Sequence, residues 1–533
     1  MLSFPVRRIH RNAWLLILLS AGLQILIFPL PNLYVLCWVA MAPMLLALLR
    51  AQRPATLQFT EGIKLLPANP AQGFVLGYAC GILWFLGTCY WIYDTMRQYG
   101  GLNTPAALGI LVLFCLYLGL YHGLFGLLIA LVAGGKSGVQ RALVAAPFLW
   151  VAVELARTRI TAFPWDLLGI AQVDNIPLSR LARVTGVYGI SCEIMIVNVA
   201  FAAAFLVPRE RRFQLLLAAV AAAMMLQSGR LINPAPLPTD KTALLVQENV
   251  PILEASDWTR EYFDNTMREL ASLSLTPPGG KRPDLIAWPE SPAPFYTSDP
   301  LFREGLGNVA RASHTWVLAG SLGIRTANQT PQKVTELYNS GALFSPEGEL
   351  VSRYDKVHLV PFGEYVPFKS IFSFAGGLTK EVGDFTHGAS RDPLDAGGTR
   401  LGVFICYESV FPDEVRQFAG NGAQVFVNIS NDGWYGDSGA YAQHLKQARM
   451  RAMENDRWLL RDTNTGVTAS IDPYGRVVAS VPRKVRTVLE APYALTNVTT
   501  FYSRHGDWFA YLCAIISVAA LLMRLPFRRK IER

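Results

Sequence analysis

The chain has 533 residues, of which 52% are apolar and 16% are charged, and its formal net charge is +9. Soluble proteins usually carry about 25% charged residues, so this composition predicts that a large part of the chain lies in a lipid bilayer. The basic residues cluster beside apolar runs, at 6–11, 208–212 and 524–533. This placement is typical of cytoplasmic membrane anchors and argues against a nucleic-acid-binding role.

Eight apolar runs have about the length that a membrane-spanning helix needs. The first has no clear small-x-small cleavage site and a second run follows at once, so we interpret it as an uncleaved anchor. With the N-terminus in the cytoplasm, most flanking basic residues then lie on the cytoplasmic side, and Arg157, Arg159, Arg180 and Arg183 are the exceptions. The predicted spans are 12–30, 33–49, 70–93, 104–133, 140–156, 187–207, 212–228 and 506–524.

Three domains follow from these spans: a seven-helix membrane domain at 1–231, an extracytoplasmic domain at 232–500, and a last helix with a basic tail at 501–533. The stretch INPAPLPTD at 232–240 is interpreted as a linker. The middle part alternates buried β-rich runs with amphipathic stretches, which predicts an α/β domain with parallel strands. Strands are expected at 242–247, 284–290, 315–321, 400–406 and 423–429, and helices at 256–273 and 439–456.

One cysteine differs from the other six in its surroundings. Cys406 ends a predicted strand and precedes a helical stretch, where a helix N-terminus or a nearby lysine would lower the pKa of the thiol. The alternative is a small buried core residue. No C-x-x-C spacing occurs, which argues against a zinc or redox site. The cysteines in apolar runs are Cys37, Cys80, Cys89, Cys115, Cys192 and Cys513.

Two charged residues stand beside other predicted strands. Glu290 follows an apolar strand, where α/β sheets place ligands, and Lys356 shares one face of a probable strand with His358. Solvated surface charges are the alternative in each case. With Cys406, however, these residues would provide the base, the cation and the nucleophile that acyl transfer requires.

The segments around these three residues resemble the nitrilase, or carbon–nitrogen hydrolase, superfamily. They are WPES with Glu290, YDKVHLVPFGEY with Lys356 and ICYES with Cys406, and the resemblance continues through 427–477. It implies a Glu–Lys–Cys triad on an αββα sandwich.

With its apolar runs, the whole chain resembles the apolipoprotein N-acyltransferases. FPWDLLG at 163–169, PFGEYVPF at 361–368 and NDGWYGDS at 431–438 are also similar to that family. One departure is VQENVP at 246–251, where the family more often has glycine before the asparagine. We expect this departure to lie away from the triad.

The resemblance implies the last step of bacterial lipoprotein maturation. A phospholipid would donate an acyl chain, through a thioester on Cys406, to the α-amino group of the diacylglyceryl-modified N-terminal cysteine of an apolipoprotein. Glu290 would be the base, and Lys356 with a backbone N–H near Tyr407 would hold the oxyanion. No cofactor, metal or nucleic acid is implied, and H-E-x-x-H, Walker A and G-x-G-x-x-G patterns do not occur. A monomer of the inner membrane, with periplasmic catalytic domain and cytoplasmic termini, is expected.

Four residues are expected to support the triad through the same resemblance. Glu364 would orient Lys356 or supply a second carboxylate, Glu408 would support the loop after the nucleophile, and Tyr407 and Trp258 match further positions. Plain packing is the alternative for Trp258. Glu154 and His122 lie inside predicted spans, and we assign neither to catalysis.

A lid is expected at 367–385, where an apolar patch precedes paired glycines that could act as a hinge. An ordinary packed loop is the alternative for this segment.

Three other functions are compatible with parts of the pattern. Water as the acceptor would make the protein a membrane-bound amidase or lipid hydrolase. An inactive domain on a transporter or sensor would lack a triad member, and all three are present. A papain-like cysteine–histidine pair would use His358 or His444.

Overall fold

The computed structural model describes residues 9–53, 65–135, 137–252, 258–290, 295–329, 332–361, 363–365 and 385–523. The chain forms two compact units. The first contains Met1–Tyr93, Thr104–Asn233 and Asp507–Arg533, and the second contains Asp94–Asn103 and Pro234–Gly506. The membrane domain predicted at 1–231 includes 94–103, which lie in the second compact unit.

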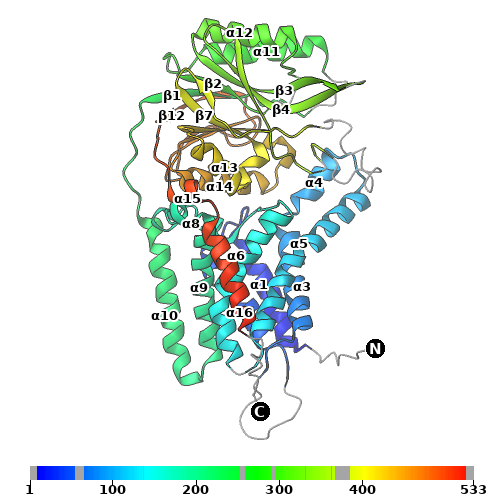
Figure 1. Cartoon of the computed structure of the whole chain (residues 1–533), viewed down its shortest axis with the longest axis vertical. Helices are drawn as coiled ribbons and strands as arrows, with labels where there is room; N and C mark the ends of the chain where they lie inside the picture. Colours follow the sequence, from blue (N-terminus) through cyan, green and yellow to red (C-terminus); the bar gives the residue numbers. More distant parts are fainter. Residues whose placement is uncertain are drawn as a thin grey trace, which may run out of the picture. The chain divides into compact units, whose positions relative to one another are not determined.

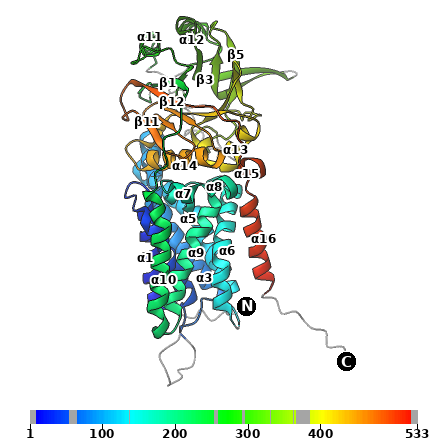
Figure 2. The same ribbon diagram turned by 90° about the vertical axis from the view of Figure 1, so that its left-hand side faces the viewer.

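The first unit is built from helices that run side by side (Figure 2). Among the described residues, five helical segments are long and apolar enough to cross a membrane, and three shorter apolar ones accompany them. The helices are α1 (Arg11–Ile27), α2 (Ala42–Leu49), α3 (Pro70–Thr88), α4 (Trp91–Gln98, which continues into the second unit), α5 (Thr104–Val132), α6 (Gly138–Ile160), α7 (Ile176–Ser179), α8 (Ala182–Thr185), α9 (Val187–Leu206), α10 (Arg209–Ser228) and α16 (Trp508–Leu522).

All eight predicted runs therefore contain apolar helix, while their number as spans stays a prediction. Two runs differ from expectation. The second is a 3-10 turn, η1 (Tyr34–Trp38), followed by the eight-residue α2. The third ends at Thr88, before the separate helix α4.

Helices α3 and α5 approach closely because glycines face each other. A Cβ atom at Gly77 would lie 2.2 Å from the carbonyl oxygen of His122, and one at Gly126 would lie 2.1 Å from that of Gly73. Small residues at such spacing allow membrane helices to pack backbone to backbone. Elsewhere the helices expose large apolar side chains, such as Leu113 at 66%, as lipid-facing surfaces do.

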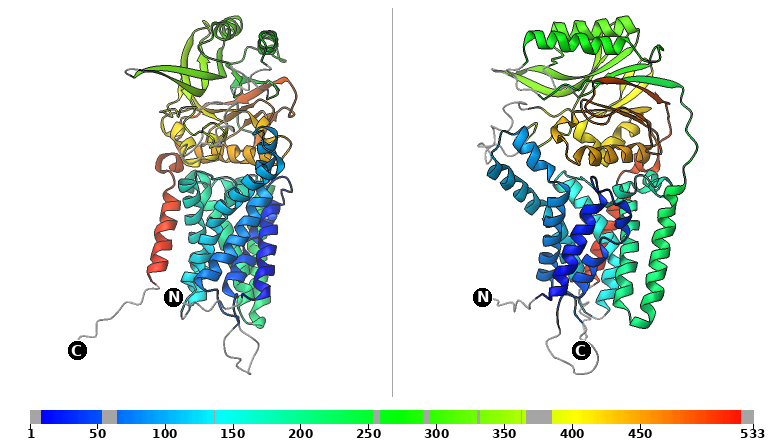
Figure 3. Two further views of the ribbon diagram at one scale, coloured as in Figure 1. Left: turned by 90° about the vertical axis from the view of Figure 1, so that its right-hand side faces the viewer. Right: turned by 180° about the vertical axis from the view of Figure 1, so that it is seen from behind.

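The second unit is a four-layer αββα sandwich (Figures 1 and 3). The fold class predicted for this part is confirmed. Its helices are α11 (Arg260–Leu275), α12 (Pro300–Ser313), α13 (Pro412–Gly420), α14 (Ala440–Asn455) and α15 (Phe501–His505), with 3-10 turns η6 (Cys406–Val410) and η7 (Asp432–Tyr435). Its strands are β1 (Lys241–Gln247), β2 (Leu285–Trp288), β3 (Trp316–Gln329), β4 (Gln332–Phe344), β5 (Leu350–Asp355), β6 (Leu394–Ala396), β7 (Thr399–Ile405), β8 (Val425–Ser430), β9 (Leu459–Thr463), β10 (Ala469–Ile471), β11 (Val477–Ser480) and β12 (Thr487–Tyr493).

The two sheets have six strands each, in the orders β12-β1-β2-β3-β4-β5 and β11-β10-β9-β8-β7-β6. Each has three parallel strands at its centre, β1-β2-β3 and β7-β8-β9, and antiparallel strands outside them. The five predicted strands are β1, β2, β3, β7 and β8. Their nearly continuous apolar sequences arise because parallel strands are buried on both faces.

Two apolar cores hold the layers together. One lies between the sheets, and one lies between the first sheet and helices α11 and α12 (Figure 1). Parallel strands such as β1-β2-β3 and β7-β8-β9 have their carboxyl ends at the same edge of a sheet. This edge is where α/β proteins place their functional residues.

Candidate active site

Cys406 stands at the end of the central strand β7, as the first residue of η6. Its φ angle is +49°, a left-handed conformation that is uncommon for a residue other than glycine. The side chain is buried, with 6% of the residue exposed. A sharp turn at this point brings the chain out of the sheet, and backbone strain of this kind is typical of functional positions.

Lys356 lies between two carboxylates. Its Nζ is 2.9 Å from Oε1 of Glu364 and 3.3 Å from Oε1 of Glu290. The amide of Asn339 donates to the same two oxygens, at 2.7 and 2.8 Å. The second oxygen of Glu364 accepts from the backbone N–H of Val360 at 2.7 Å. Glu364 therefore binds the ammonium group of Lys356 with one oxygen and the backbone with the other.

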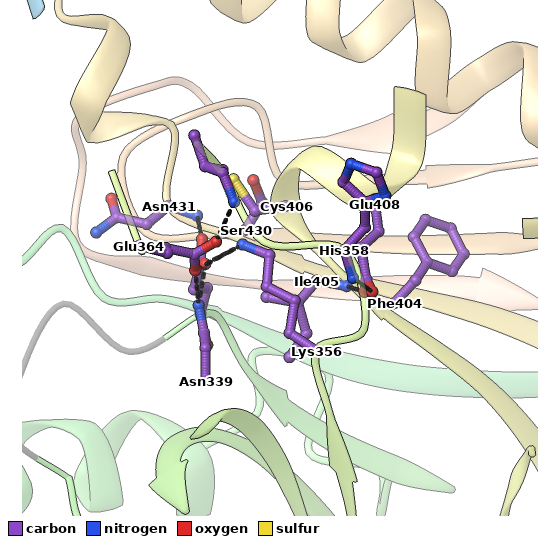
Figure 4. A network of polar contacts seen from close by, with 12 residues as sticks. Asn339, Lys356, His358, Glu364, Phe404, Ile405, Cys406, Glu408, Ser430 and Asn431 are labelled. Carbon is purple, nitrogen blue, oxygen red and sulfur yellow. Dashed lines mark hydrogen bonds and ion pairs between the residues drawn. The ribbon is translucent and has the colours of Figure 1, made fainter. Parts of the chain in front are cut away.

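The predicted base, Glu290, is fixed from the other sheet as well. Its Oε2 accepts the backbone N–H of Asn431, which follows β8, at 2.8 Å. Figure 4 shows Lys356 reaching toward Glu364 and Asn339, with Cys406 beside this group. The structure therefore brings together the three residues predicted for the triad.

Burial and two neighbouring charges shift the pKa of the Cys406 thiol. Burial raises the pKa of the thiol, the carboxylate of Glu290 raises it further, and Lys356 lowers it. The net direction is upward, so the predicted lowering toward thiolate is wrong. Burial alone would lower the pKa of Lys356, but Glu290 and Glu364 reverse this and keep it above its usual value. The resting pair is a neutral thiol and a charged ammonium.

Glu408 hydrogen-bonds to the segments around the nucleophile. One oxygen accepts from the hydroxyl of Tyr354 at 2.8 Å and from the backbone N–H groups of Val357 at 2.8 Å and His358 at 3.0 Å. The other accepts from the N–H of Ile405 at 2.7 Å. This carboxylate joins the segment after Lys356 to the strand before Cys406.

A buried network underlies the nucleophile on the other side. Arg461 holds Asp432 at 2.8 Å, and Asp432 holds Nδ1 of His444 at 3.0 Å. Nε2 of His444 lies 3.1 Å from the carbonyl oxygen of Cys406 and 2.8 Å from Oγ of Ser409. The imidazole therefore contacts the backbone of the nucleophile, and this geometry does not support a papain-like pair with His444.

His358 also lies differently from the prediction. Strand β5 ends at Asp355, so Lys356 and His358 do not alternate along a strand. Nδ1 of His358 is 2.9 Å from Glu414, and its ring centroid is 3.8 Å from that of Phe411. Figure 4 shows the side chains of Lys356 and His358 directed apart.

The other predicted supporting residues have mixed outcomes. Tyr407 is buried after the nucleophile, with its ring 5.1 Å from Phe411. Trp258 packs against Tyr262 and Phe295, at ring distances of 5.0 and 6.3 Å, as its packing alternative describes. Of the predicted lid, only Phe385 is among the described residues, and it is buried.

The two ionisable residues in predicted spans belong to the first unit. Glu154 accepts the backbone N–H of Leu168 at 2.7 Å, and His122 lies 3.2 Å from the amide of Gln24. Both are buried.

The residue at which VQENVP departs from the family is Glu248, and its neighbour Asn249 is connected to the site through Asn464 and Asn431. The N–H of Asn249 donates to the carbonyl of Asn464 at 2.9 Å, and the amide of Asn464 donates to Asn431 at 3.1 Å. Asn431 in turn contacts Glu290. Across the part of the chain that the structure describes, no group of three or more metal-ligating side chains occurs.

Sequence reasoning missed Asn339, Arg461 and the supporting role of His444. An asparagine inside an apolar strand, as in ELYNS, was the available signal for Asn339, because a buried amide needs polar partners. Nothing in the sequence pairs Arg461 with Asp432 across two strands.

Comparisons with known proteins found two matching family models and similar solved structures. A family model described as carbon–nitrogen hydrolase matches residues 247–501, and one described as the apolipoprotein N-acyltransferase N-terminal domain matches residues 20–200. Among solved structures, an amidase from Nesterenkonia sp. is similar to 52% of this chain over 98% of its own, with 18% identity and a TM-score of 0.35.

Two relatives extend the similarity over nearly the whole chain. The apolipoprotein N-acyltransferase of Geobacter metallireducens is 34% identical over 98% of this chain and 96% of its own. That of Methylococcus capsulatus is 34% identical over 84% of this chain and 87% of its own. The chain belongs to the apolipoprotein N-acyltransferase family.

Proposed function

We propose that this chain transfers an acyl chain from a phospholipid to the α-amino group of the N-terminal cysteine of an apolipoprotein, which already carries a diacylglyceryl group. The observation that supports this most is the buried Cys406 at the end of β7, beside the contact of Lys356 with Glu290 (Figure 4), in a chain of this family. Substrates that live in the membrane account for the apolar helices of the first unit.

The first half-reaction forms an acyl-enzyme. As Sγ of Cys406 attacks the ester carbonyl, its proton passes to Glu290, and Lys356 with a backbone N–H near Tyr407 stabilises the oxyanion. The ester C–O bond then breaks. The leaving lysophospholipid oxygen takes the proton from Glu290, and a thioester remains on Cys406.

The second half-reaction transfers the acyl group. The amine attacks the thioester carbonyl and loses a proton to Glu290, the C–S bond breaks, and Cys406 regains a proton from Glu290. An amide product and a free thiol result, so the reaction follows a ping-pong course. Glu364 and Glu408 hold the cation and the loop during both halves.

The surroundings of the reaction belong to the same proposal. The catalytic unit would lie on the periplasmic side of the inner membrane, with both termini in the cytoplasm. One chain would suffice, because the base, the cation and the nucleophile all come from it.

The test is the fate of the acyl group. Purified protein in detergent would receive a phospholipid labelled in its acyl chain, with either a diacylglyceryl peptide or water as acceptor. We expect labelled amide from wild type and from Cys115→Ala, a control in helix α5, and none from Cys406→Ala. Release of labelled fatty acid at the same rate with and without peptide would instead show a hydrolase.

A further inference from the structure

Residues 94–103, DTMRQYGGLN, precede the long apolar helix α5, yet they are part of the second compact unit. Two of their hydroxyls reach the turn η7. Oγ1 of Thr95 donates to the carbonyl of Trp434, and the phenol of Tyr99 donates to the carbonyl of Gly433, both at 2.9 Å. The ring of Tyr99 also packs edge-on against Trp434, with centroids 5.2 Å apart.

The turn that these hydroxyls hold begins at the active site. The N–H of Asn431 donates to Glu290, and Asp432 contacts His444, whose ring reaches the carbonyl of Cys406. Consecutive residues of one loop thus position the base and the nucleophile. A shift of this loop would move both.

The other end of the loop is held separately. The carbonyl of Gly436 accepts from Nη2 of Arg483 at 2.8 Å, and the Arg483 guanidinium stacks on Tyr441 at 3.5 Å. Between Asn431 and Gly436, the described side-chain donors to the carbonyls of Gly433 and Trp434 are those of the 94–103 segment. These hydroxyls therefore fix the middle of the loop.

We propose that residues 94–103 are a positioning element of the active site. The hydroxyls of Thr95 and Tyr99 hold the η7 turn so that the N–H of Asn431 and the carboxylate of Asp432 keep their places. This inference rests on the proposed function for its kinetic test. It assigns a role in catalysis to a segment that neither the strand pattern nor the triad identifies.

The test compares full-length variants in detergent. Thr95→Val and Tyr99→Phe each remove one hydroxyl at nearly constant shape. Because both hydrogen bonds to the η7 turn are lost, we expect the double variant to lower kcat about tenfold with the phospholipid KM unchanged. Thr95→Ser should keep the wild-type kcat. Tyr93→Phe, the same change on helix α4, is the matched control.

Several outcomes would overturn the inference. They are a wild-type kcat in the double variant, a loss that Tyr93→Phe reproduces, and a loss in Thr95→Val that Thr95→Ser also shows. Hydrogen exchange adds a readout that needs no activity. Amides at 431–435 should exchange faster in the double variant while those of β8 stay protected, and unchanged exchange would contradict the proposal.

Failure of the proposed function gives a different pattern. If wild type forms no acyl product, the acyltransferase assignment fails. The positioning role is then judged by exchange at 431–435 and by the alkylation rate of Cys406 with iodoacetamide, read by peptide mass spectrometry. An alkylation rate equal to wild type in the double variant, with unchanged exchange, would overturn it.

Discussion

Cys406 combines three properties that rarely meet in one residue: a left-handed backbone, a buried side chain and a raised thiol pKa. A neutral thiol needs a base at the moment of attack, and a thiolate that forms there needs a cation. Glu290 and Lys356 supply this base and this cation, and they contact each other at 3.3 Å. The arrangement favours activation by the substrate over a standing thiolate.

The charges predict opposite pH shifts for two variants. Glu290 raises the pKa of Cys406 and Lys356 lowers it. In Glu290→Gln the pH profile of Cys406 alkylation should therefore move toward acid, and in Lys356→Met toward alkali, each by about one unit or more. Iodoacetamide labelling across a pH series measures both. Lys281→Met, on the surface, is the control, and shifts in one common direction would contradict the account.

At the residue scale, the sequence predicted site residues correctly where they lie at or just after the end of a strand. Glu290 and Cys406 could be placed because both strands are short, apolar and followed by turn or helix signals. The thiol pKa could not, because it depends on burial and on distances between residues far apart in sequence. The same limit hid Asn339, whose two carboxylate partners come from other segments.

Among the elements, the close packing of helices α3 and α5 depends on glycines, which have no side chain at the contact. Gly77→Ala places a methyl group 2.2 Å from the carbonyl oxygen of His122, so the helices must separate. We expect a loss of about 1–3 kcal/mol in the stability of the first unit. Gly109→Ala, in the partner helix α5, meets nothing within 4 Å and should be neutral. Thermal unfolding in detergent compares them, and equal melting temperatures would contradict close packing.

Glu248, directly after strand β1, and Asp462, in strand β9, are both buried. Burial raises the pKa of Glu248, although the charge of Arg486 lowers it in part. Burial also raises the pKa of Asp462, and the carboxylate of Glu248 raises it further. The folded state then keeps protons that the unfolded chain releases above the ordinary carboxyl pKa. Stability should therefore fall as pH rises from the ordinary carboxyl pKa toward the raised folded values.

The variant Glu248→Gln tests this pair. It removes one of the two titrating groups, so the drop in melting temperature between about pH 5 and about pH 8 should become smaller. Glu304→Gln, an exposed residue of α12, should leave the drop as it is. A drop that is unchanged in Glu248→Gln would mean that this carboxyl is not protonated in the folded chain.

Element prediction succeeded where periodicity was strong and failed at breaks. The five predicted strands and the helices α11 and α14 are present because buried parallel strands and amphipathic helices leave plain patterns. The break after Thr88 and the 3-10 start of the second run were missed, since apolar composition continues through both. Edge strands such as β11, mostly exposed, carry little signal.

At the scale of the whole molecule, the chain forms one apolar helical unit and one αββα catalytic unit. The division follows from composition, because charged residues are scarce in one part and ordinary in the other. The exception is 94–103, which belongs to the catalytic unit although apolar helices stand on both sides of it in sequence. Contacts with the turn η7, far away in sequence, assign 94–103 to the catalytic unit, and no local sequence pattern predicts these contacts.

The central claim is that Cys406 carries the acyl group between two lipid substrates. The most direct measurement is mass spectrometry of full-length protein incubated with a labelled phospholipid and no acceptor, before and after neutral hydroxylamine. The account predicts one hydroxylamine-labile acyl adduct on the peptide with Cys406, absent in Cys406→Ala and discharged by a diacylglyceryl peptide. No adduct on Cys406, or an adduct that the peptide does not discharge, would contradict it.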